Sequence, residues 1–316
     1  MKKLLFFFIL VISSYCLFGK TKNQNDCIQP LLSPINDTPV IKMHVGNVVL
    51  HFTEQGKGEP VLLLHGGQGD YRSWTKQVEA LAPRYRVITY SRRYHFPNEN
   101  HLTPQPYNAL TDAGDLAGFI DSLKLDRVHL IGTSYGAFTA LAFAMIHPHR
   151  VLTMVLAEPP LLQWATTTIR GAELYHEFMN TVHNPAGKAF AAGDSTGALG
   201  LLINRFDGPG AFDALPPERK KVIYQNARFF QAITASPDPF PDLPREKIKN
   251  ITLPVLVVRG ANTKELDVLV SEEVLRTLPN AEKAVIPNAG HGSPRQNPEA
   301  FNAAVLGFLE KHRDKK

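Results

Sequence analysis

Short continuous runs of apolar residues recur along the chain, each followed by a polar or glycine-rich turn, and they predict buried strands. A strand covered on both faces needs apolar side chains throughout, whereas a half-exposed strand alternates. The intervening segments space their apolar residues for helices, as in "ALTDAGDLAGFIDSLKL", where Thr111 is placed to cap the start. Strands alternating with helices predict an α/β fold with a mostly parallel central sheet flanked by helices. The runs are "PVLLLHGG", "YRVITYSRRY", "RVHLIGTSYG", "RVLTMVLAEPP", "LPVLVVRG" and "AEKAVIP".

The helical segments and one hairpin refine this pattern. Gly46-Asn47, between "VIKMHV" and "VVLHFTEQG", is a dipeptide typical of a hairpin turn. Other helices are predicted over about 73–81, 268–278 and 298–311, from apolar spacing and proline boundaries.

The alternation of strands and helices stops after the sixth strand. From residue 161 to residue 249 only helical patterns remain, as in "GAELYHEFMNTVH" and "PERKKVIYQNARFFQAIT", separated by Pro- and Gly-rich stretches. We therefore expect one sheet domain, residues 40–160 and 250–316, interrupted by a helical insertion, residues 161–249.

The N-terminus has a different character from the rest of the chain. Residues 1–19, "MKKLLFFFILVISSYCLFG", combine a basic start with an apolar run, as in a secretory signal peptide. The run is shorter than the about 20 apolar residues that a stable membrane span needs, so no transmembrane span is expected after cleavage of the signal peptide. Residues 20–39 have the polar, Pro-containing composition of a linker. The expectation is an exported protein, periplasmic or extracellular. Cys16 raises the alternative of a lipid anchor, which Tyr15 before it disfavours.

Composition narrows the classes of partner. The chain has 316 residues, 44% of them apolar, enough for a large core, and a formal net charge of +5. The basic residues form no stripe interleaved with aromatics, which disfavours a nucleic-acid partner. Cys16 and Cys27 are the two cysteines and do not have the spacing of a metal site. No metal or cofactor is expected.

The segment "HLIGTSYGAFTALA" predicts a nucleophile. Gly132-Thr133-Ser134-Tyr135-Gly136 is a G-x-S-x-G pattern placed after an apolar strand and before a helix. Such a turn is so tight that side chains two residues to either side of the serine would clash, and glycine removes both clashes. The serine hydroxyl then projects above the sheet edge, next to a helix N-terminus that favours negative charge.

Two further loops predict the partners of Ser134. "LLLHGGQGDYRSW" follows a strand, and the backbone N–H of Gly67 with that of Tyr135 would hold an oxyanion. "IPNAGHGSPRQNPEAF" places His291 after the last strand, where a general base is expected. His95 is the closest competitor among the twelve histidines.

With "HGG", "SRRYH", "GTSYG" and "GHG" in this order, the chain resembles the α/β-hydrolase superfamily over about residues 40–311. Within it the chain resembles lidded bacterial enzymes of the epoxide hydrolase, haloperoxidase-like and dehalogenase-like branch. The resemblance implies an α/β-hydrolase fold, with the helical insertion as a lid. True epoxide hydrolases and dehalogenases have an Asp nucleophile, whereas Ser134 stands here, so neither reaction is expected. The serine favours hydrolysis of an ester or related acyl bond of a small, largely apolar molecule. A perhydrolase, an acyltransferase, a C–C bond hydrolase and a non-catalytic binding protein remain alternatives.

The acid that would orient His291 is the open question. The usual place, three residues after Gly260 at the end of the seventh strand, holds Thr263. Glu158 ends the preceding strand and matches an alternative position that some members of the superfamily use. Glu158 is therefore the predicted acid, with Asp267 or Glu265 as alternatives.

Several residues are candidates for the substrate pocket. Gln68 follows the predicted oxyanion loop, and Trp164 belongs to the predicted lid. In "SRRYHFPN", Arg92 could bind an anionic group and His95 could line the pocket mouth. The preferred alternative for the arginines is structural, pinning this loop to a carboxylate such as Asp70 or Asp115.

Overall fold

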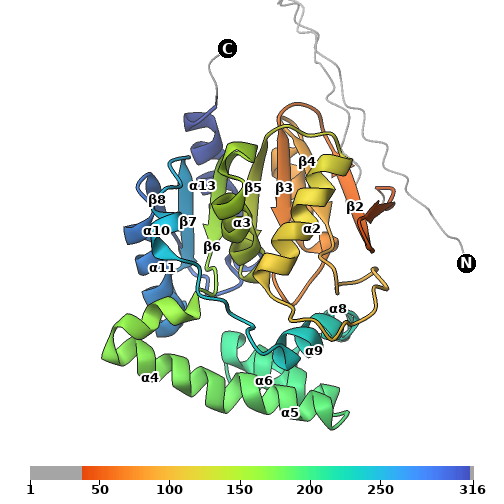
Figure 1. Ribbon diagram of the computed structural model, residues 1–316, viewed down its shortest axis with the longest axis vertical. Coiled ribbons are helices and arrows are strands. Elements are labelled where there is room, and N and C mark those ends of the chain that lie inside the picture. Colours follow the sequence, from red (N-terminus) through yellow and green to blue (C-terminus); the bar gives the residue numbers. More distant parts are fainter. Residues whose placement is uncertain (1–37, 314–316) are drawn as a thin grey trace, which may run out of the picture. The chain divides into compact units, whose positions relative to one another are not determined.

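A computed structural model describes residues 38–313, which form an eight-stranded sheet flanked by helices (Figure 1). The strand order is β1-β2-β4-β3-β5-β6-β7-β8. β1 and β2 pair antiparallel, as do β2 and β4, and all other pairs are parallel. The predicted fold class, a mostly parallel sheet between helices, is confirmed. The strands are β1 (Ile41–Val45), β2 (Val48–Gln55), β3 (Pro60–Leu64), β4 (Arg86–Tyr90), β5 (Val128–Thr133), β6 (Val151–Ala157), β7 (Val255–Gly260) and β8 (Ala281–Ile286).

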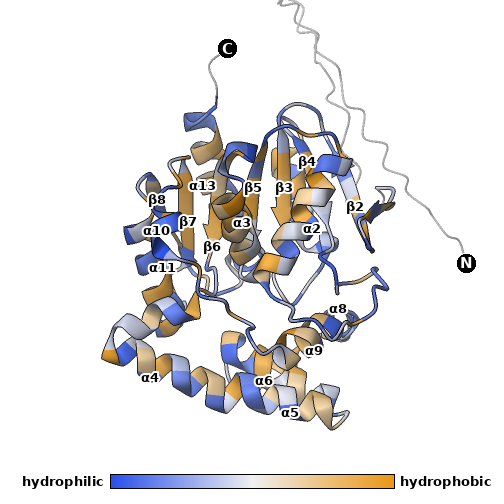
Figure 2. Ribbon diagram, viewed as in Figure 1, coloured by the Kyte–Doolittle hydropathy of each residue, from blue (hydrophilic) through white to orange (hydrophobic). Residues whose placement is uncertain are grey.

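The two faces of the sheet are covered by different helices. Side chains alternate along a strand, so Leu62 and Leu64 of β3 enter one core cluster, and Val61 and Leu63 enter the other. The first cluster contains apolar residues of α2 (Ala109–Ser122), α3 (Tyr135–Ile146) and α11 (Glu265–Thr277). The second contains those of α1 (Thr75–Leu81) and α13 (Pro298–Lys311). Because both faces are covered, most residues of the inner strands are apolar (Figure 2).

The segment between β6 and β7 is helical, as the sequence pattern predicts, and lies at the end of the sheet where β6 ends (Figure 1). A short 3-10 helix, η4 (Leu162–Thr167), precedes the first helix of this segment. A π-helical turn, η5 (Met179–His183), joins its first two helices. The helices are α4 (Ile169–Phe178), α5 (Asn184–Ala191), α6 (Ser195–Asp207), α7 (Ala211–Ala214), α8 (Pro217–Gln225), α9 (Ala227–Ala235) and α10 (Arg245–Ile248). The remaining helical elements of the core are η2 (Tyr71–Trp74), η3 (Pro148–Arg150) and α12 (Ser293–Gln296).

Three local expectations differ from the structure. Helix α2 is capped by Asn108, whose side chain accepts from the N–H of Leu110, so Thr111 lies inside the helix. Helix α11 begins at Glu265, one turn before the predicted start. The predicted helix over "PERKKVIYQNARFFQAIT" divides at Asn226, where the backbone leaves the helical region (φ −104°, ψ 9°) and the buried side chain accepts from the N–H of Phe96.

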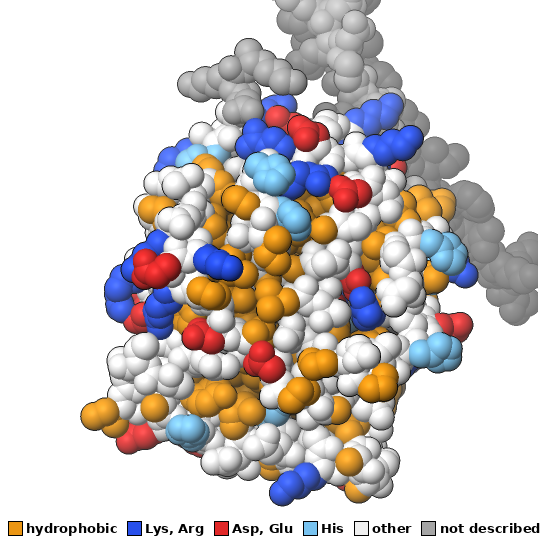
Figure 3. Space-filling model, viewed as in Figure 1, with side chains coloured by type: hydrophobic (Ala, Val, Ile, Leu, Met, Phe, Trp, Pro, Cys, Tyr) orange, Lys and Arg blue, Asp and Glu red, His pale blue; other side chains and the backbone are white. Residues whose placement is uncertain are grey.

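The surface of the described part carries both signs of charge. On the face in Figure 3, Lys and Arg side chains lie among Asp and Glu side chains, and apolar side chains gather between them. Within residues 38–313 no helix has the length and apolar character that crossing a bilayer requires.

Candidate active site

Ser134 occupies the sharp turn between β5 and α3. Its backbone has φ +51° and ψ −124°, outside the regions that side chains with a Cβ usually adopt. The turn is held by a hydrogen bond from Ser134 N–H to Ala157 O of 2.7 Å, which joins it to the end of β6. Strain of this kind persists only where surrounding contacts determine it, and here the strand–helix geometry does so.

The glycines that flank Ser134 are required by close backbone contacts. A Cβ at Gly136 would lie 2.1 Å from the carbonyl oxygen of Leu64, and one at Gly132 would lie 2.6 Å from Cα of Ala137. Both contacts are with backbone, which cannot turn aside as a flexible side chain does. The steric reason inferred from the G-x-S-x-G spacing therefore applies in the folded chain.

The side chain of His291 is held by Glu158, at the position after β6. His291 Nδ1 lies 2.7 Å from Glu158 Oε2, and the Glu158 side chain is 1% exposed. Glu158 has φ +50°, so the chain turns sharply at this residue as it leaves the strand. An ionised carboxylate is an acceptor only, so Nδ1 carries the proton and Nε2 is left as the free base.

The second oxygen of Glu158 is occupied by the end of β7. Oε1 accepts from the N–H of Gly260 at 2.8 Å and from the hydroxyl of Thr263 at 2.5 Å. Thr263, at the position where the resemblance places an acid, is thus a donor to the acid on the neighbouring strand. Of the alternative acids, Glu265 pairs with Arg170, and Asp267 pairs with Arg205.

The pair of Glu158 and His291 favours its charged form. Burial alone would raise the pKa of Glu158, but the hydrogen bond and charge of His291, followed by the donors Thr263 and Gly260, lower it below its usual value. Burial would lower the pKa of His291, whereas the hydrogen bond and charge of Glu158, with a smaller effect of Asp267, raise it above 6.5. The surroundings therefore stabilise an imidazolium beside a carboxylate.

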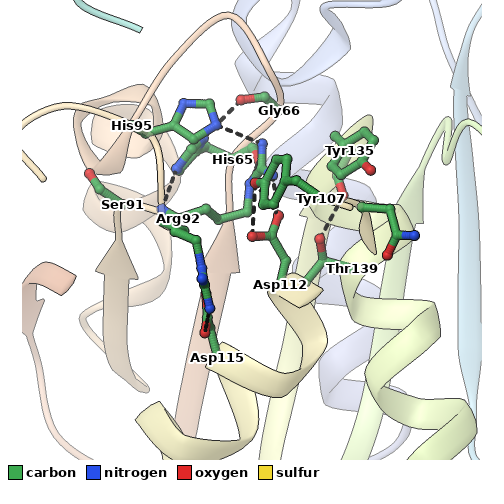
Figure 4. Close-up of polar contacts among 12 residues, drawn as sticks. His65, Gly66, Ser91, Arg92, His95, Tyr107, Asp112, Asp115, Tyr135 and Thr139 are labelled. Atoms are coloured by element: carbon green, nitrogen blue, oxygen red, sulfur yellow. Dashed lines mark hydrogen bonds and ion pairs between the residues drawn. The ribbon is translucent and has the colours of Figure 1, made fainter. Parts of the chain in front are cut away.

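The predicted oxyanion donors border the same space as Ser134. The N–H of Tyr135 is the first of helix α3 and has no acceptor within the helix. His65 Nε2 accepts from the N–H of Arg92 at 3.1 Å, so its Nδ1–H donates to Gly66 O at 2.8 Å (Figure 4). Because C=O and N–H of one peptide point in opposite directions, this bond turns the N–H of Gly67 away from His65.

A cavity of about 190 Å³ adjoins Ser134, His291, Gly67 and Tyr135. An apolar cavity of ~150 Å³ holds a benzene molecule, so a ring-sized part of a substrate fits here. Residues of the helical insertion form much of the wall, and most are apolar. These include Leu162, Phe178, Leu202, Phe229, Phe230 and Phe240.

Of the four predicted pocket residues, Gln68 lines the cavity, whereas Arg92, His95 and Trp164 do not. Arg92 is 1% exposed and forms a buried ion pair with Asp112 (Figure 4). His95 is covered by Phe229 of the insertion at 4.7 Å between ring centroids, and Trp164 donates its indole N–H to Leu243 O. These three side chains are structural. Arg92 anchors its loop, as the preferred interpretation had it, but the carboxylate is Asp112 and neither Asp70 nor Asp115.

The adjacent Arg93 makes the ion pair that the sequence suggested, with Asp115 at 2.6 Å. Three residues at or beside the site were not predicted for the roles they have here. Thr263 donates to Glu158, Phe206 stacks on His291, and Arg219 enters the cavity wall. No sequence motif marks them, because each acts through a segment distant in the chain.

The fold and the geometry at the sheet edge define a hydrolase, and comparison with known families agrees. The family model of the alpha/beta hydrolase fold matches residues 59–298, and the chain belongs to this family. The protein is an enzyme of the hydrolase class.

Its similarities within the family span several substrates. It is 28% identical over 283 residues to the 2-hydroxy-6-oxononadienedioate/2-hydroxy-6-oxononatrienedioate hydrolase 2 of Pseudomonas putida, covering 83% of this chain and 91% of that protein. Its fold is similar to a thermophilic esterase from Thermogutta terrifontis, with TM-score 0.69, 22% identity, and coverage of 87% and 99% of the two chains. The enol-lactonase from Burkholderia xenovorans LB400 has TM-score 0.67, 20% identity, and coverage of 85% and 100%. The family model confirms the expected α/β-hydrolase superfamily.

The predicted location of the protein is wrong by these comparisons. The relatives that match, among them the 2-hydroxy-6-oxo-dienoate hydrolases, contradict a periplasmic or extracellular location, and this expectation is withdrawn. The predicted signal peptide (1–19), the lipid anchor at Cys16 and nearly all of the predicted linker (20–39) lie outside the described residues.

Proposed function

We propose that the chain is a serine hydrolase that cleaves an ester or related acyl bond of a small, largely apolar molecule. The observation that carries the proposal is the convergence of Ser134 and His291 on one apolar cavity, with His291 held by Glu158 at 2.7 Å. A nucleophile, a base and an acid that orients the base are the parts that acyl transfer requires.

The proposed reaction has two stages. Ser134 Oγ attacks the carbonyl carbon as its proton passes to His291 Nε2, and the imidazolium is stabilised by Glu158. The oxyanion accepts hydrogen bonds from the N–H groups of Gly67 and Tyr135, and the leaving group departs with the proton from His291. Water, deprotonated by the same histidine, then releases the acid and restores the Ser134 hydroxyl.

A serine-directed fluorophosphonate tests the nucleophile. The probe should label Ser134, and Ser134→Ala should lose at least about 10⁴-fold in kcat for a short aryl ester. Ser73 also lines the cavity, so Ser73→Ala is a matched control that should still be labelled. Ester hydrolysis that persists in Ser134→Ala, or labelling elsewhere, would exclude this mechanism.

Carbon–carbon bond hydrolysis is a second candidate, favoured by the charge in the cavity wall. The substrate in the P. putida relative's name has a ketone and two carboxylates but no ester, so its hydrolysis breaks a carbon–carbon bond. Arg219 lines the cavity of this chain and donates to Gln68 Oε1 at 3.2 Å, with no carboxylate within ion-pair distance among residues 38–313. Burial, with the charge of Arg295 next, lowers the pKa of Arg219 to about 10. An anionic substrate would neutralise this charge.

The two candidates differ in what Arg219 does. With a 2-hydroxy-6-oxo-dienoate as substrate, Arg219→Gln should raise KM about tenfold or more, as the loss of a charged hydrogen bond predicts. With a neutral aryl ester the same variant should change KM little. Turnover of the ester but not of the dienoate by the wild-type enzyme would eliminate the second candidate.

A further inference from the structure

The last turn of α6 contacts the core directly at His291. The ring of Phe206 stacks on the imidazole, with ring centroids 4.3 Å apart and an angle of 17° between the planes. Phe206 belongs to the helical insertion and His291 to the loop after β8, and both line the cavity. The candidate base therefore has one edge against Glu158 and one face against the insertion.

The two neighbours of Phe206 also contact the core. Arg205 donates to Asp267 of α11 at 3.2 Å, and both side chains are largely buried. Asp207 lies 3.8 Å from Arg295 of α12. Consecutive helical residues point about 100° apart, so these contacts hold the turn from both sides and fix where the Phe206 ring lies.

A parallel aromatic contact constrains an imidazole in two ways. The ring face opposes rotation of the imidazole out of its plane while Glu158 holds Nδ1, so the position of Nε2 is fixed as well. The negative π face also attracts a cation, and so it favours the imidazolium that forms during acyl transfer. Glu158 and Asp267 act on the charge of His291 in the same direction, whereas Arg205 opposes them.

We propose that Phe206 is a positioning residue for His291, through which the helical insertion fixes the plane of the base and stabilises its protonated form. The inference rests on the proposed function. It assigns to α6 a part in proton transfer, beyond the shaping of the substrate cavity.

The test compares two phenylalanines of the insertion in the full chain. Phe206→Leu should lower kcat about tenfold with KM within about threefold, and should move the acid limb of kcat/KM down by roughly half a pH unit or more. Phe206→Tyr keeps the ring and should retain both values. Phe178→Leu removes a cavity phenylalanine whose ring packs against His183 and Phe240 instead of the base, so KM should change while the acid limb stays in place.

A second measurement does not depend on turnover. Titration of the His291 imidazole by NMR should give a lower pKa in Phe206→Leu than in wild type, and a wild-type value in Phe206→Tyr. If Phe206→Leu does not fold by circular dichroism, Phe206→Met replaces it with the same expectation. Unchanged titration in the folded variant, or equal shifts in the Phe206 and Phe178 variants, would overturn the inference. Failure of the wild type to react with a fluorophosphonate would instead refute the proposed function, whatever the titration gives.

Discussion

Replacing Glu158 by Gln tests the least expected member of the site. Glu158 Oε1 accepts from Gly260 and Thr263, and Oε2 faces His291 Nδ1 at 2.7 Å. In Glu158→Gln the amide oxygen can keep both donors from the end of β7, which leaves the NH₂ group facing Nδ1. That group donates, so Nδ1 must become the acceptor and Nε2 must carry the proton. The variant should therefore fold but hold the base in the wrong tautomer.

The size of the loss follows from the same geometry. The charges of the Glu158 carboxylate and of the His291 imidazolium are each delocalised, so their centres lie about 4 Å apart. At this distance and an effective dielectric constant of about 20, a pair of unit charges interacts by about 4 kcal/mol. This is about three powers of ten in rate, and the wrong tautomer adds to it. We expect kcat/KM at neutral pH to fall about 10³- to 10⁴-fold, as it does when a triad carboxylate becomes an amide.

The assay is steady-state hydrolysis of an aryl ester, with circular dichroism and a melting curve to establish folding. Asp267→Asn is the matched control, because Asp267 is the other buried carboxylate near His291. It should lose less than about tenfold, since Asp267 acts on His291 only through its charge and, indirectly, through the Arg205 contact that holds the last turn of α6. Activity of Glu158→Gln within tenfold of wild type, or a larger loss in Asp267→Asn, would refute the assignment of Glu158.

Three further expectations concern the same part of the molecule. The double variant Glu158→Gln/Thr263→Asp should recover about tenfold or more of the activity lost in Glu158→Gln, because the new carboxylate starts at the same sheet edge; no recovery would show that Thr263 is too far from His291. His291 must be neutral to act as a base, and its pKa is raised above 6.5, so kcat/KM should fall as pH drops through that raised value. An acid limb of kcat/KM at about pH 6 or lower would contradict the contact with Glu158. Arg92→Met leaves Asp112 buried without its cation, so the free energy of unfolding measured in urea should fall by about 3–5 kcal/mol. A fall of less than about 1 kcal/mol would mean that water or another donor replaces Arg92.

The sequence was informative wherever the chemistry depends on neighbours along the chain. The strands and the Ser134 turn follow from apolar runs and from two glycines whose added Cβ atoms would meet backbone. The pairing of His291 with Glu158 needed one further step, which joined a position implied by the family resemblance to the rule that parallel strands end at the same edge of a sheet. Both inferences use short-range sterics or regular topology, which a single sequence specifies.

The sequence failed where a side chain's surroundings come from a remote segment. Arg92 was a pocket candidate because it follows a strand at the catalytic edge, but Asp112 of α2 pairs with it in the core. His95 was a candidate for the same reason, and Phe229 of the insertion covers it. Phe206 gave no signal, since the packing of α6 against the loop after β8 is tertiary.

The position of the acid follows from the pairing of β6 with β7. These strands are adjacent and parallel, with Ala157 opposite Val258, so a residue just after β6 and one just after β7 start from neighbouring points. One histidine at this edge can reach either point, but two carboxylates there would repel each other and raise a pKa. A glutamate after β6 therefore favours an uncharged donor after β7, and Thr263 supplies one by giving its hydroxyl proton to Glu158. The absence of an acid after Gly260 is thus the counterpart of the acid on the next strand.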